Sequence, residues 1–335
     1  MEHSFRSPDS DTIEISVVVP VRDEEESIRI LLDGLLGQTL APREIVITDG
    51  GSVDATREII EEFVQRGAPV KLFREQNSMP GRARNVGVKN AACDWIAFTD
   101  AGIRPEADWL AAMAARAGAD VEVVYGSFAP IVDTFFKECA AIAYLPPPSE
   151  IAGVSTSARS IASALMRRHV WQNVGGFPED LRSAEDLVFM KRIEARGFRE
   201  LRAPAAMVHW NIQGNLWRTF KRFVTYARNN IRAGLWRQWQ AAIFQRYAVL
   251  AIISVPAIFF GWRWLVVSFV CWIGLLMARA LKALSKNQKA YPAGPGRNLL
   301  RLIMLLPIIA TLDLAAFAGS INWLLLDQLH LKRTR

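Results

Sequence analysis

The feature that most constrains this chain is its C-terminal segment from Leu201 to Leu312, which contains no acidic residue. Residues 201–335 carry 18 Lys and Arg against 2 Asp and Glu, whereas residues 1–200 carry 22 against 31. A basic, tryptophan-rich stretch suits an anionic membrane surface, where each nearby Lys or Arg contributes about 1 kcal/mol. Nucleic acid would accept the same charge, but the long apolar runs that follow favour lipid. We therefore expect an anionic membrane, and no nucleic acid, as partner.

The basic segment from Asn215 to Gln240 has the pattern of an amphipathic helix. Apolar side chains recur every three or four positions, and basic side chains occupy much of the remaining surface. The apolar set is Leu216, Phe220, Phe223, Val224, Ala227, Ile231 and Leu235, and the basic set is Arg218, Lys221, Arg222, Arg228, Arg232 and Arg237. This pattern predicts helices that lie in the membrane interface.

Two long apolar runs follow this segment. Residues 247–281 are too many for one ordinary membrane-spanning helix and too few for two full ones, so we expect a tight hairpin with Arg263 at its turn. Residues 299–326 form a third candidate, interrupted by Pro307 and Asp313. Three full spans would leave the basic C-terminal tail outside the cell, against the positive-inside rule. One segment is therefore expected to be re-entrant or only partly embedded.

The N-terminal part of the chain alternates strand and helix patterns. Short apolar, β-branched runs predict strands at 13–20, 44–48, 70–73 and 95–99, and helical spacing predicts helices at 24–36, 55–65 and 82–91. This rhythm predicts a doubly wound α/β sheet. Ligands of such sheets bind beyond the carboxyl ends of the strands, so the polar segments at 20–24, 49–54 and 100–102 should converge on one crevice. A proline-rich loop is expected from Tyr144 to about Ser160, then a strand at 163–167 and a helix at 185–195.

The three cysteines, Cys93, Cys139 and Cys271, are scattered along the chain, and none forms a C-x-x-C spacing. We therefore expect neither a structural zinc site nor a disulfide framework, and a reducing compartment fits this usage. The polar N-terminus lacks the apolar segment of a signal peptide, so none is expected. These features predict an N-terminal domain in the cytosol.

Several short motifs follow one another along the N-terminal part at characteristic distances. They are Val17-Val-Val-Pro20 followed by Arg-Asp-Glu-Glu, Ile45-Val-Ile-Thr-Asp49-Gly-Gly-Ser52-Val-Asp54-Ala-Thr56, Gly81-Arg-Ala-Arg84-Asn85-Val-Gly87, Phe98-Thr-Asp100-Ala, Gly175-Gly-Phe177 and Ala184-Glu185-Asp186. Each motif is weak alone, but their order over residues 13–212 resembles that of the family-2 glycosyltransferases. The resemblance implies the GT-A fold, a nucleotide-sugar donor and an inverting reaction.

The resemblance also implies roles for the first two motifs. Pro20 and Glu24 would line the base and ribose of the donor, and Asp49 would accept a hydrogen bond from the edge of the base. The glycine-rich turn that ends at Ser52 would let the backbone approach the ligand closely. The alternative for Asp49 and Asp54 is an ordinary turn followed by a helix N-cap.

The next two motifs imply contacts with the diphosphate. Arg84 and Asn85 would lie near the base and diphosphate. Asp100 occupies the first place of the D-x-D motif, which holds a divalent cation, Mg²⁺ or Mn²⁺, against the phosphates. Gly102 replaces the second aspartate, so the cation would need Asp100, the phosphates, water and a later residue such as His209. The alternative for His209 is a packed or interfacial side chain.

Glu185 and Asp186 open a predicted helix. The resemblance implies that Asp186 is the general base, which takes the proton from the acceptor hydroxyl as that oxygen attacks the anomeric carbon. Glu185 is the reserve for this role. The alternative is a pair of acids that favour a helix N-terminus through its dipole.

Two departures from related patterns narrow the function. Processive polysaccharide synthases carry a Q-x-x-R-W motif on an interfacial helix, whereas residues 213–217 read Gln-Gly-Asn-Leu-Trp, with Leu216 at the arginine position. This favours transfer of a single sugar; a processive synthase and a degenerate nucleotide-sugar binder without transfer activity are the alternatives. A nicotinamide oxidoreductase is disfavoured because no G-x-G-x-x-G follows the first strand.

The sequence therefore predicts four parts: a flexible N-terminus (1–12), a GT-A domain (13–213), basic amphipathic interfacial helices (214–246) and membrane-embedded helices (247–335). The predicted fold is α/β, with a doubly wound, mixed GT-A sheet followed by interfacial helices and by transmembrane or re-entrant helices. The predicted function is an inverting glycosyltransferase. It would move one sugar from a UDP- or GDP-linked donor to a lipid or lipid-linked acceptor at the cytosolic face of the membrane.

Overall fold

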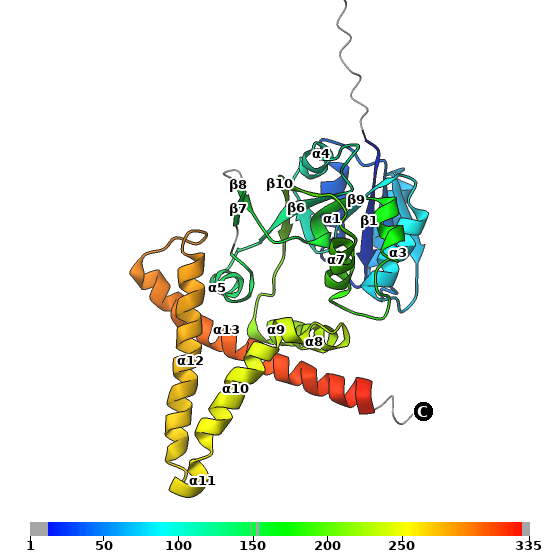
Figure 1. Cartoon of the computed structure of the whole chain (residues 1–335). Coiled ribbons are helices and arrows are strands. Elements are labelled where there is room, and N and C mark those ends of the chain that lie inside the picture. Colours follow the sequence, from blue (N-terminus) through cyan, green and yellow to red (C-terminus); the bar gives the residue numbers. More distant parts are fainter. Residues whose placement is uncertain (1–12, 148, 152–153, 330–335) are drawn as a thin grey trace, which may run out of the picture.

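The computed structural model describes residues 13–147, 149–151 and 154–329. The segment 1–12, expected to be flexible, and the basic C-terminal tail lie outside the described residues. In Figure 1, an α/β domain lies at one end of the molecule and a set of long helices lies below it.

A mixed sheet of eight strands forms the centre of the α/β domain, in the order β3-β2-β1-β4-β9-β6-β10-β5. Neighbours β3, β2, β1 and β4 are parallel, as are β6 and β10, whereas β9 and β5 run antiparallel to their neighbours. The strands are β1 (Ile15–Val21), β2 (Glu44–Asp49), β3 (Val70–Arg74), β4 (Trp95–Phe98), β5 (Ile103–Pro105), β6 (Val123–Pro130), β9 (Ala164–Arg167) and β10 (Glu200–Trp210). The predicted doubly wound, mixed sheet is confirmed.

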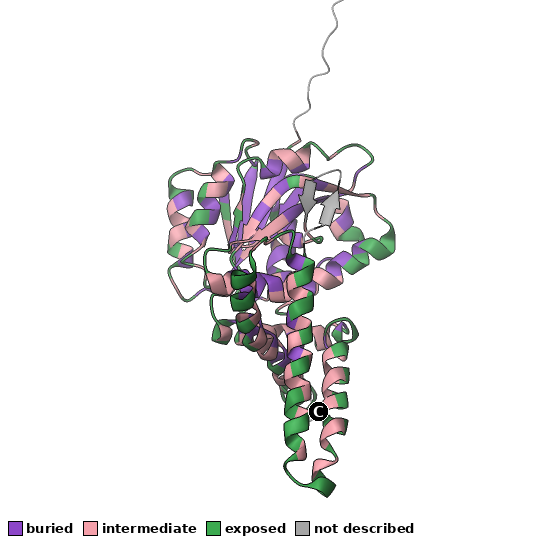
Figure 2. Ribbon diagram, turned by 90° about the vertical axis from the view of Figure 1, so that its left-hand side faces the viewer, coloured by how far each residue is buried: buried purple, intermediate pink, exposed green. Residues whose placement is uncertain are grey.

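Helices cover both faces of the sheet and bury its central strands. Such strands are continuous apolar runs because neither face meets water. On one face the core contains side chains of α1 (Ile28–Leu36), α2 (Thr56–Gln65) and α4 (Trp109–Ala114). On the other face it contains side chains of α3 (Pro80–Asn90), α6 (Arg168–Asn173) and α7 (Glu185–Arg196). The buried residues of Figure 2 gather in this sandwich.

The expected loop between Tyr144 and Ser160 is partly wrong. Strands β7 (Ser149–Ile151) and β8 (Val154–Thr156) pair antiparallel there and form a small hairpin. The β-branched residues of these short segments favour extended structure, which the proline run before them obscures in the sequence. Helix α5 (Phe135–Tyr144), which precedes the hairpin, was also not predicted.

The described C-terminal part consists of helices joined by short turns and one loop, between Asn287 and Pro295. Its elements are α8 (Leu216–Arg232), α9 (Trp236–Trp239), α10 (Ala241–Ser254), α11 (Ala257–Phe260), α12 (Trp264–Asn287), α13 (Pro295–Asn322) and a π-helical segment (Trp323–Leu329). Helices α10 and α12 form the expected hairpin, which turns between Phe260 and Trp264 (Figure 1). Three stretches are long and apolar enough to cross a membrane: Ala241–Phe260, Trp264–Asn287 and Pro295–Leu329.

Helix α13 continues through Pro307 and Asp313, the two residues that interrupt the last apolar run in the sequence. Proline removes one backbone donor, and helices in apolar surroundings tolerate this when side chains satisfy neighbouring groups. Asp313 is fully buried and accepts hydrogen bonds from Arg279 of α12.

Candidate active site

A cleft of about 1320 Å³ opens at the carboxyl ends of β1 and β4. This is where ligands bind to open α/β sheets. Six of the predicted site residues line the cleft: Pro20, Glu24, Arg84, Asp100, Glu185 and Asp186. The other four, Asp49, Ser52, Asn85 and His209, are not among the described residues that line it.

Asp49 and Ser52 lie beneath the cleft and shape the turn after β2. The buried Asp49 carboxylate accepts hydrogen bonds from the backbone N–H of Ser52 at 3.0 Å and from its hydroxyl at 2.5 Å. The Ser52 hydroxyl in turn accepts from the N–H of Asp23, which joins this turn to the loop after β1. Gly51 has a φ of 91°, a conformation that glycine adopts at little cost. The turn thereby places the backbone of Gly50 on the cleft wall.

Asn85 holds the loop that contains Gly176 and Phe177. Its amide donates to the carbonyl of Phe177 and to Glu179, and its oxygen accepts from the Phe177 N–H and the Trp171 indole N–H, all at 2.9 Å. Gly176 packs so closely that a Cβ atom would lie 2.9 Å from the Asn85 oxygen. The structure therefore gives the Asn85 side chain a positioning role.

Arg84 is the buried centre of a charge cluster. Its guanidinium lies 2.6 Å from Glu185 Oε1 and 2.6 Å from Asp100 Oδ1, and it stacks on the ring of Phe177 at 5.4 Å. Burial alone would lower the pKa of Arg84, but Asp100, Glu185 and Asp186 raise it, so the side chain stays charged. Residues far apart in the sequence thus meet because α3 and α7 cover the same face of the sheet.

Asp186 faces the cleft from the first turn of α7. One carboxylate oxygen accepts from the backbone N–H of Leu187 at 2.8 Å. Burial, and then the nearby charge of Glu185, raise the pKa of Asp186 to about 7, although Arg84 opposes the shift. A carboxylate with this pKa exchanges protons near neutral pH, as a general base must. Glu185, by contrast, is occupied by its ion pair with Arg84.

Asp100 offers a hard-cation site built around one carboxylate. Its side chain is 42% exposed in the cleft, and only one oxygen pairs with Arg84. Within the described ranges, no group of three His, Cys, Asp or Glu side chains could hold a metal ion alone. His209 instead pairs with Glu106 at 2.9 Å. Mg²⁺ is commonly held by one or two carboxylates and substrate phosphates, so Asp100 fits such a cation when a diphosphate is bound.

Arg222 of α8 lines the cleft, although the sequence did not predict it as a site residue. Its Nε donates to the hydroxyl of Tyr226 at 2.7 Å, and its guanidinium lies 5.3 Å from the centre of the Trp210 ring. Tyr226, Tyr144 and Asp100 raise its pKa against the effect of burial. No carboxylate in the described part of the chain forms an ion pair with it. The pattern of α8 placed Arg222 on a basic outer face, and no sequence signal separates it from its neighbours.

The cleft continues from these charged residues to the C-terminal helices. Its far end is lined by α9, α10, α12 and α13, through Trp239, Ile243, Arg279, Leu312 and Ala316. The same space therefore contacts the catalytic candidates at one end and the longest apolar helices at the other. A substrate with a polar head and an apolar tail would fit this arrangement.

Part of this chain is similar to known glycosyltransferases. Residues 16–162 match the model of glycosyl transferase family 2. Glycosyltransferase AglE of Haloferax volcanii is 28% identical over 193 residues, which cover 55% of this chain and 62% of AglE. Cholesterol galactosyltransferase of Borreliella burgdorferi is 26% identical over 106 residues, which cover 32% of this chain and 30% of that protein. This chain thus spans less than two thirds of the length of these relatives.

A solved structure supports the fold over almost the whole chain. Mannosyltransferase PcManGT from Pyrobaculum calidifontis, in complex with GDP-Man and Mn²⁺, aligns with a TM-score of 0.57 and 20% sequence identity. The alignment covers 94% of this chain and 88% of PcManGT. The two proteins share a fold.

Proposed function

We propose that this chain is an inverting glycosyltransferase that moves one sugar from a nucleotide sugar to a lipid or lipid-linked acceptor; the match of residues 16–162 to the model of glycosyl transferase family 2 supports this. The observation that carries this proposal is the single cleft that connects Asp100 and Asp186 with the apolar C-terminal helices. The donor would enter beside the sheet, and the acceptor would enter from the membrane side. The catalytic domain would lie in the cytosol.

In the proposed reaction, the Asp186 carboxylate takes the proton of the acceptor hydroxyl while that oxygen forms a bond to the anomeric carbon. The bond between this carbon and the diphosphate breaks, and its electron pair leaves with the nucleoside diphosphate. Attack from the face opposite the diphosphate inverts the anomeric configuration. A divalent cation held by Asp100 would stabilise the charge on the diphosphate.

The donor is proposed to be a UDP- or GDP-linked sugar. Pro20 and Glu24 line the cleft where the base and ribose would lie, and Gly50 offers backbone from the turn that Asp49 supports. The GDP-Man in the PcManGT structure agrees with this donor class. Asp49 would recognise the base directly or through this turn.

The acceptor is proposed to be a lipid because the cleft opens between elements suited to membrane contact. Helix α8 carries basic and aromatic side chains, and exposed Trp217, Trp236 and Trp239 lie on or near it. A relative named as a cholesterol galactosyltransferase agrees with a lipid acceptor. With Leu216 in place of a synthase arginine, single transfer is favoured over processive synthesis.

Purified full-length protein in vesicles tests the function directly. UDP- and GDP-sugars would first be screened by thermal stabilisation, since a specific ligand stabilises the folded state. The stabilising donor would then be supplied with a total lipid extract. A glycolipid with inverted anomeric configuration is expected. Donor binding without hydrolysis or transfer would identify a degenerate binder, and a growing polymer would identify a processive synthase.

Metal dependence gives a first prediction. We expect transfer to stop in excess chelator and to return with Mg²⁺ or Mn²⁺. Asp100→Ala should lose at least about 10-fold in activity, because it removes the carboxylate that faces the phosphates. His209→Ala should lose much less, because His209 pairs with Glu106 away from the cleft lining. Full activity in chelator would show that the cluster needs no metal.

Arg222 gives a second prediction. Since this cation has no carboxylate partner among the described residues, we expect it to bind a phosphate group in the cleft. Arg222→Gln should weaken UDP or GDP binding by about 10-fold, as expected for loss of a charge-assisted hydrogen bond, without weakening nucleoside binding. Calorimetry measures both affinities. The matched control is Lys221→Gln, because Lys221 is the neighbouring basic residue and lies over the exposed Trp217 ring. Equal UDP or GDP affinities in the parent protein, Arg222→Gln and Lys221→Gln would contradict this role.

A further inference from the structure

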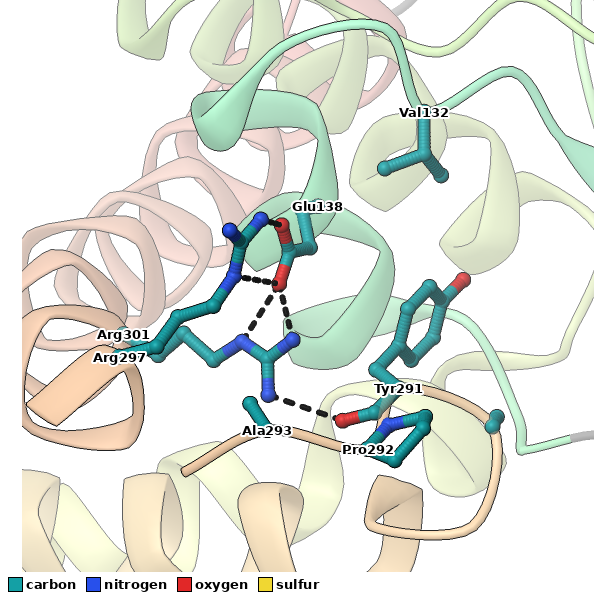
Figure 3. A pocket seen from close by; sticks show the side chains of 8 residues that line it. Val132, Glu138, Tyr291, Pro292, Ala293, Arg297 and Arg301 are labelled. Atoms are coloured by element: carbon teal, nitrogen blue, oxygen red, sulfur yellow. Dashed lines mark hydrogen bonds and ion pairs between the residues drawn. The ribbon is translucent and has the colours of Figure 1, made fainter. Parts of the chain in front are cut away.

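Helix α13 and the segment after it are long and apolar enough to cross a membrane, yet both ends contact the catalytic side of the molecule. Near the start of α13, Arg297 and Arg301 bind Glu138 of α5 (Figure 3). The Arg301 side chain is only 4% exposed and also donates to the carbonyl of Tyr291 at 2.9 Å. The buried pair of Arg301 with Glu138 fixes the beginning of α13 beside α5, because breaking one partner of such a pair is costly.

The far end of α13 is fixed to α8. Asp327 accepts from Arg228 at 2.8 and 2.9 Å, and Arg232 lies 3.8 Å away. At Gly319 the two helices touch so closely that a Cβ atom would lie 2.5 Å from the carbonyl of Val224. This glycine therefore permits the closest approach of α13 to α8.

Helix α8 is itself joined to the catalytic domain. The side chain of Asn229 accepts from the backbone N–H of Arg182, at the loop before α7, and Arg232 pairs with Asp180 at 3.2 Å. Both ends of the helical stretch from Arg297 to Asp327 are thus tied to one water-facing domain. At 1.5 Å per residue this stretch is about 45 Å long, more than the roughly 30 Å hydrocarbon core of a bilayer.

A helix that crossed the bilayer would place its two ends on opposite sides, which these contacts forbid. Figure 1 shows α13 running across the base of the α/β domain, whereas the α10–α12 hairpin points away from that domain. The hairpin is buried only toward the end of α12, at Leu276, Ala280 and Asn287, and its tip carries exposed Trp262 next to Arg263. Tryptophan is enriched at membrane interfaces, so this tip suits the far surface of a bilayer.

The side of α13 that faces away from the domain is apolar and open. Its exposed residues, with those of the π-helical segment, are Leu299, Leu300, Ile303, Leu314, Ile321, Leu324, Leu325, Leu326 and Leu329. This surface and the hairpin are both apolar and both exposed, so lipid is the partner that would cover both. We propose that only the α10–α12 hairpin crosses the bilayer, and that α13 lies in the membrane surface as the platform of the catalytic domain.

This arrangement places Ile13 and Leu329, the first and last described residues, on the catalytic side of the membrane. It agrees with the positive-inside rule, because two crossings leave Lys282, Lys286 and Lys289, at the end of the hairpin, on the same side as the domain. The α13 helix is then the segment expected to be only partly embedded.

Labelling of single cysteines in the full-length protein tests the proposal without reference to activity. The half-exposed Cys271 would be changed to Ala, and the buried Cys93 and Cys139 would stay. One cysteine is then introduced at a time, in Asp120→Cys on the domain surface, Gln328→Cys after α13 and Arg263→Cys at the hairpin tip. A membrane-impermeant maleimide is applied to one face of sealed membranes and then to both faces.

We expect Asp120→Cys and Gln328→Cys to label from the same face, and Arg263→Cys to label from the opposite face. Labelling of Gln328→Cys from the face opposite Asp120→Cys would overturn the proposal, because α13 would then cross the bilayer. Labelling of Arg263→Cys from the catalytic face would overturn the crossing of the hairpin. All three positions are exposed, so each variant should retain the thermal stability of its parent, which is measured alongside.

Discussion

Asp186→Asn is expected to lower sugar transfer by at least about 100-fold while leaving donor affinity unchanged, because general-base catalysis contributes about 10²- to 10⁴-fold. Asparagine keeps the size of the side chain and its bond to the Leu187 N–H, but it cannot accept the acceptor proton. The loss should therefore appear in kcat, with calorimetric donor binding as the second readout.

The pH dependence of transfer gives this prediction its control. The pKa of Asp186 is raised to about 7, so the carboxyl becomes protonated, and the base is lost, as pH falls below 7. Transfer at pH 5 should be about 100-fold slower than on the alkaline plateau. The residual activity of Asp186→Asn should lack this step. Asp120→Asn, on an exposed carboxylate paired with Arg199, should behave as the parent protein.

Glu185→Gln distinguishes the two adjacent acids. Glu185 is only 5% exposed and already accepts from Arg84, so its loss should mainly affect stability and the position of Arg84. If Asp186→Asn turned over normally and Glu185→Gln abolished transfer at unchanged stability, the roles of the two residues would be reversed.

The fold was largely predictable because its strands are short, continuous apolar runs. The strands β1 to β4 and the helices between them appear where the periodicity predicts them, within a few residues. The strands β6 and β10, which pair with each other in parallel, were not predicted. β6 contains Gly126 and ends at Pro130, and β10 contains Pro204, and such residues interrupt the apolar runs from which strands are predicted.

From the sequence, the candidate site could be predicted only as a set of motif residues, and not as the contacts that these residues make. The order of motifs selected ten residues, and the fold brings six of them to one cleft. Asp49, Ser52 and Asn85 instead organise the turns beside the cleft through hydrogen bonds that depend on tertiary contacts. Arg222 could not be distinguished from the other basic residues of α8, because its role depends on the direction in which that helix faces the sheet.

The few acidic residues in and around α13 form ion pairs with arginines. Glu138 of α5 pairs with Arg301, Asp313 of α13 pairs with Arg279, and Asp327 of the π-helical segment pairs with Arg228. Arg228 and Arg232 of α8 pair with acids and Arg222 lines the cleft, so Arg218 and Lys221 are its basic residues that stay available for anionic lipid, whose attraction salt weakens. The hairpin, by contrast, would hold the protein in the bilayer by hydrophobic insertion, which salt does not reverse.

Arg84→Met is expected to be the most destabilising single change in the α/β domain. It leaves the buried Glu185 without its partner, and breaking a buried ion pair in this way costs about 3–5 kcal/mol. It should also raise the pKa of Asp186 further, because Arg84 is the group that lowers it. Any remaining transfer should then reach its plateau only at a more alkaline pH. Thermal unfolding in detergent and a pH–rate profile measure the two effects.

Arg82→Met is the matched control, since Arg82 lies on the same helix but pairs with Glu75 at the surface, with its side chain 50% exposed. Such surface pairs contribute only about 0–1 kcal/mol. The double variant Arg84→Met/Glu185→Leu should recover part of the stability lost in Arg84→Met, because it removes the uncompensated carboxylate together with its partner. Equal unfolding temperatures for Arg84→Met and Arg82→Met, or no recovery in the double variant, would mean that the Arg84 cluster is not the electrostatic centre of the site.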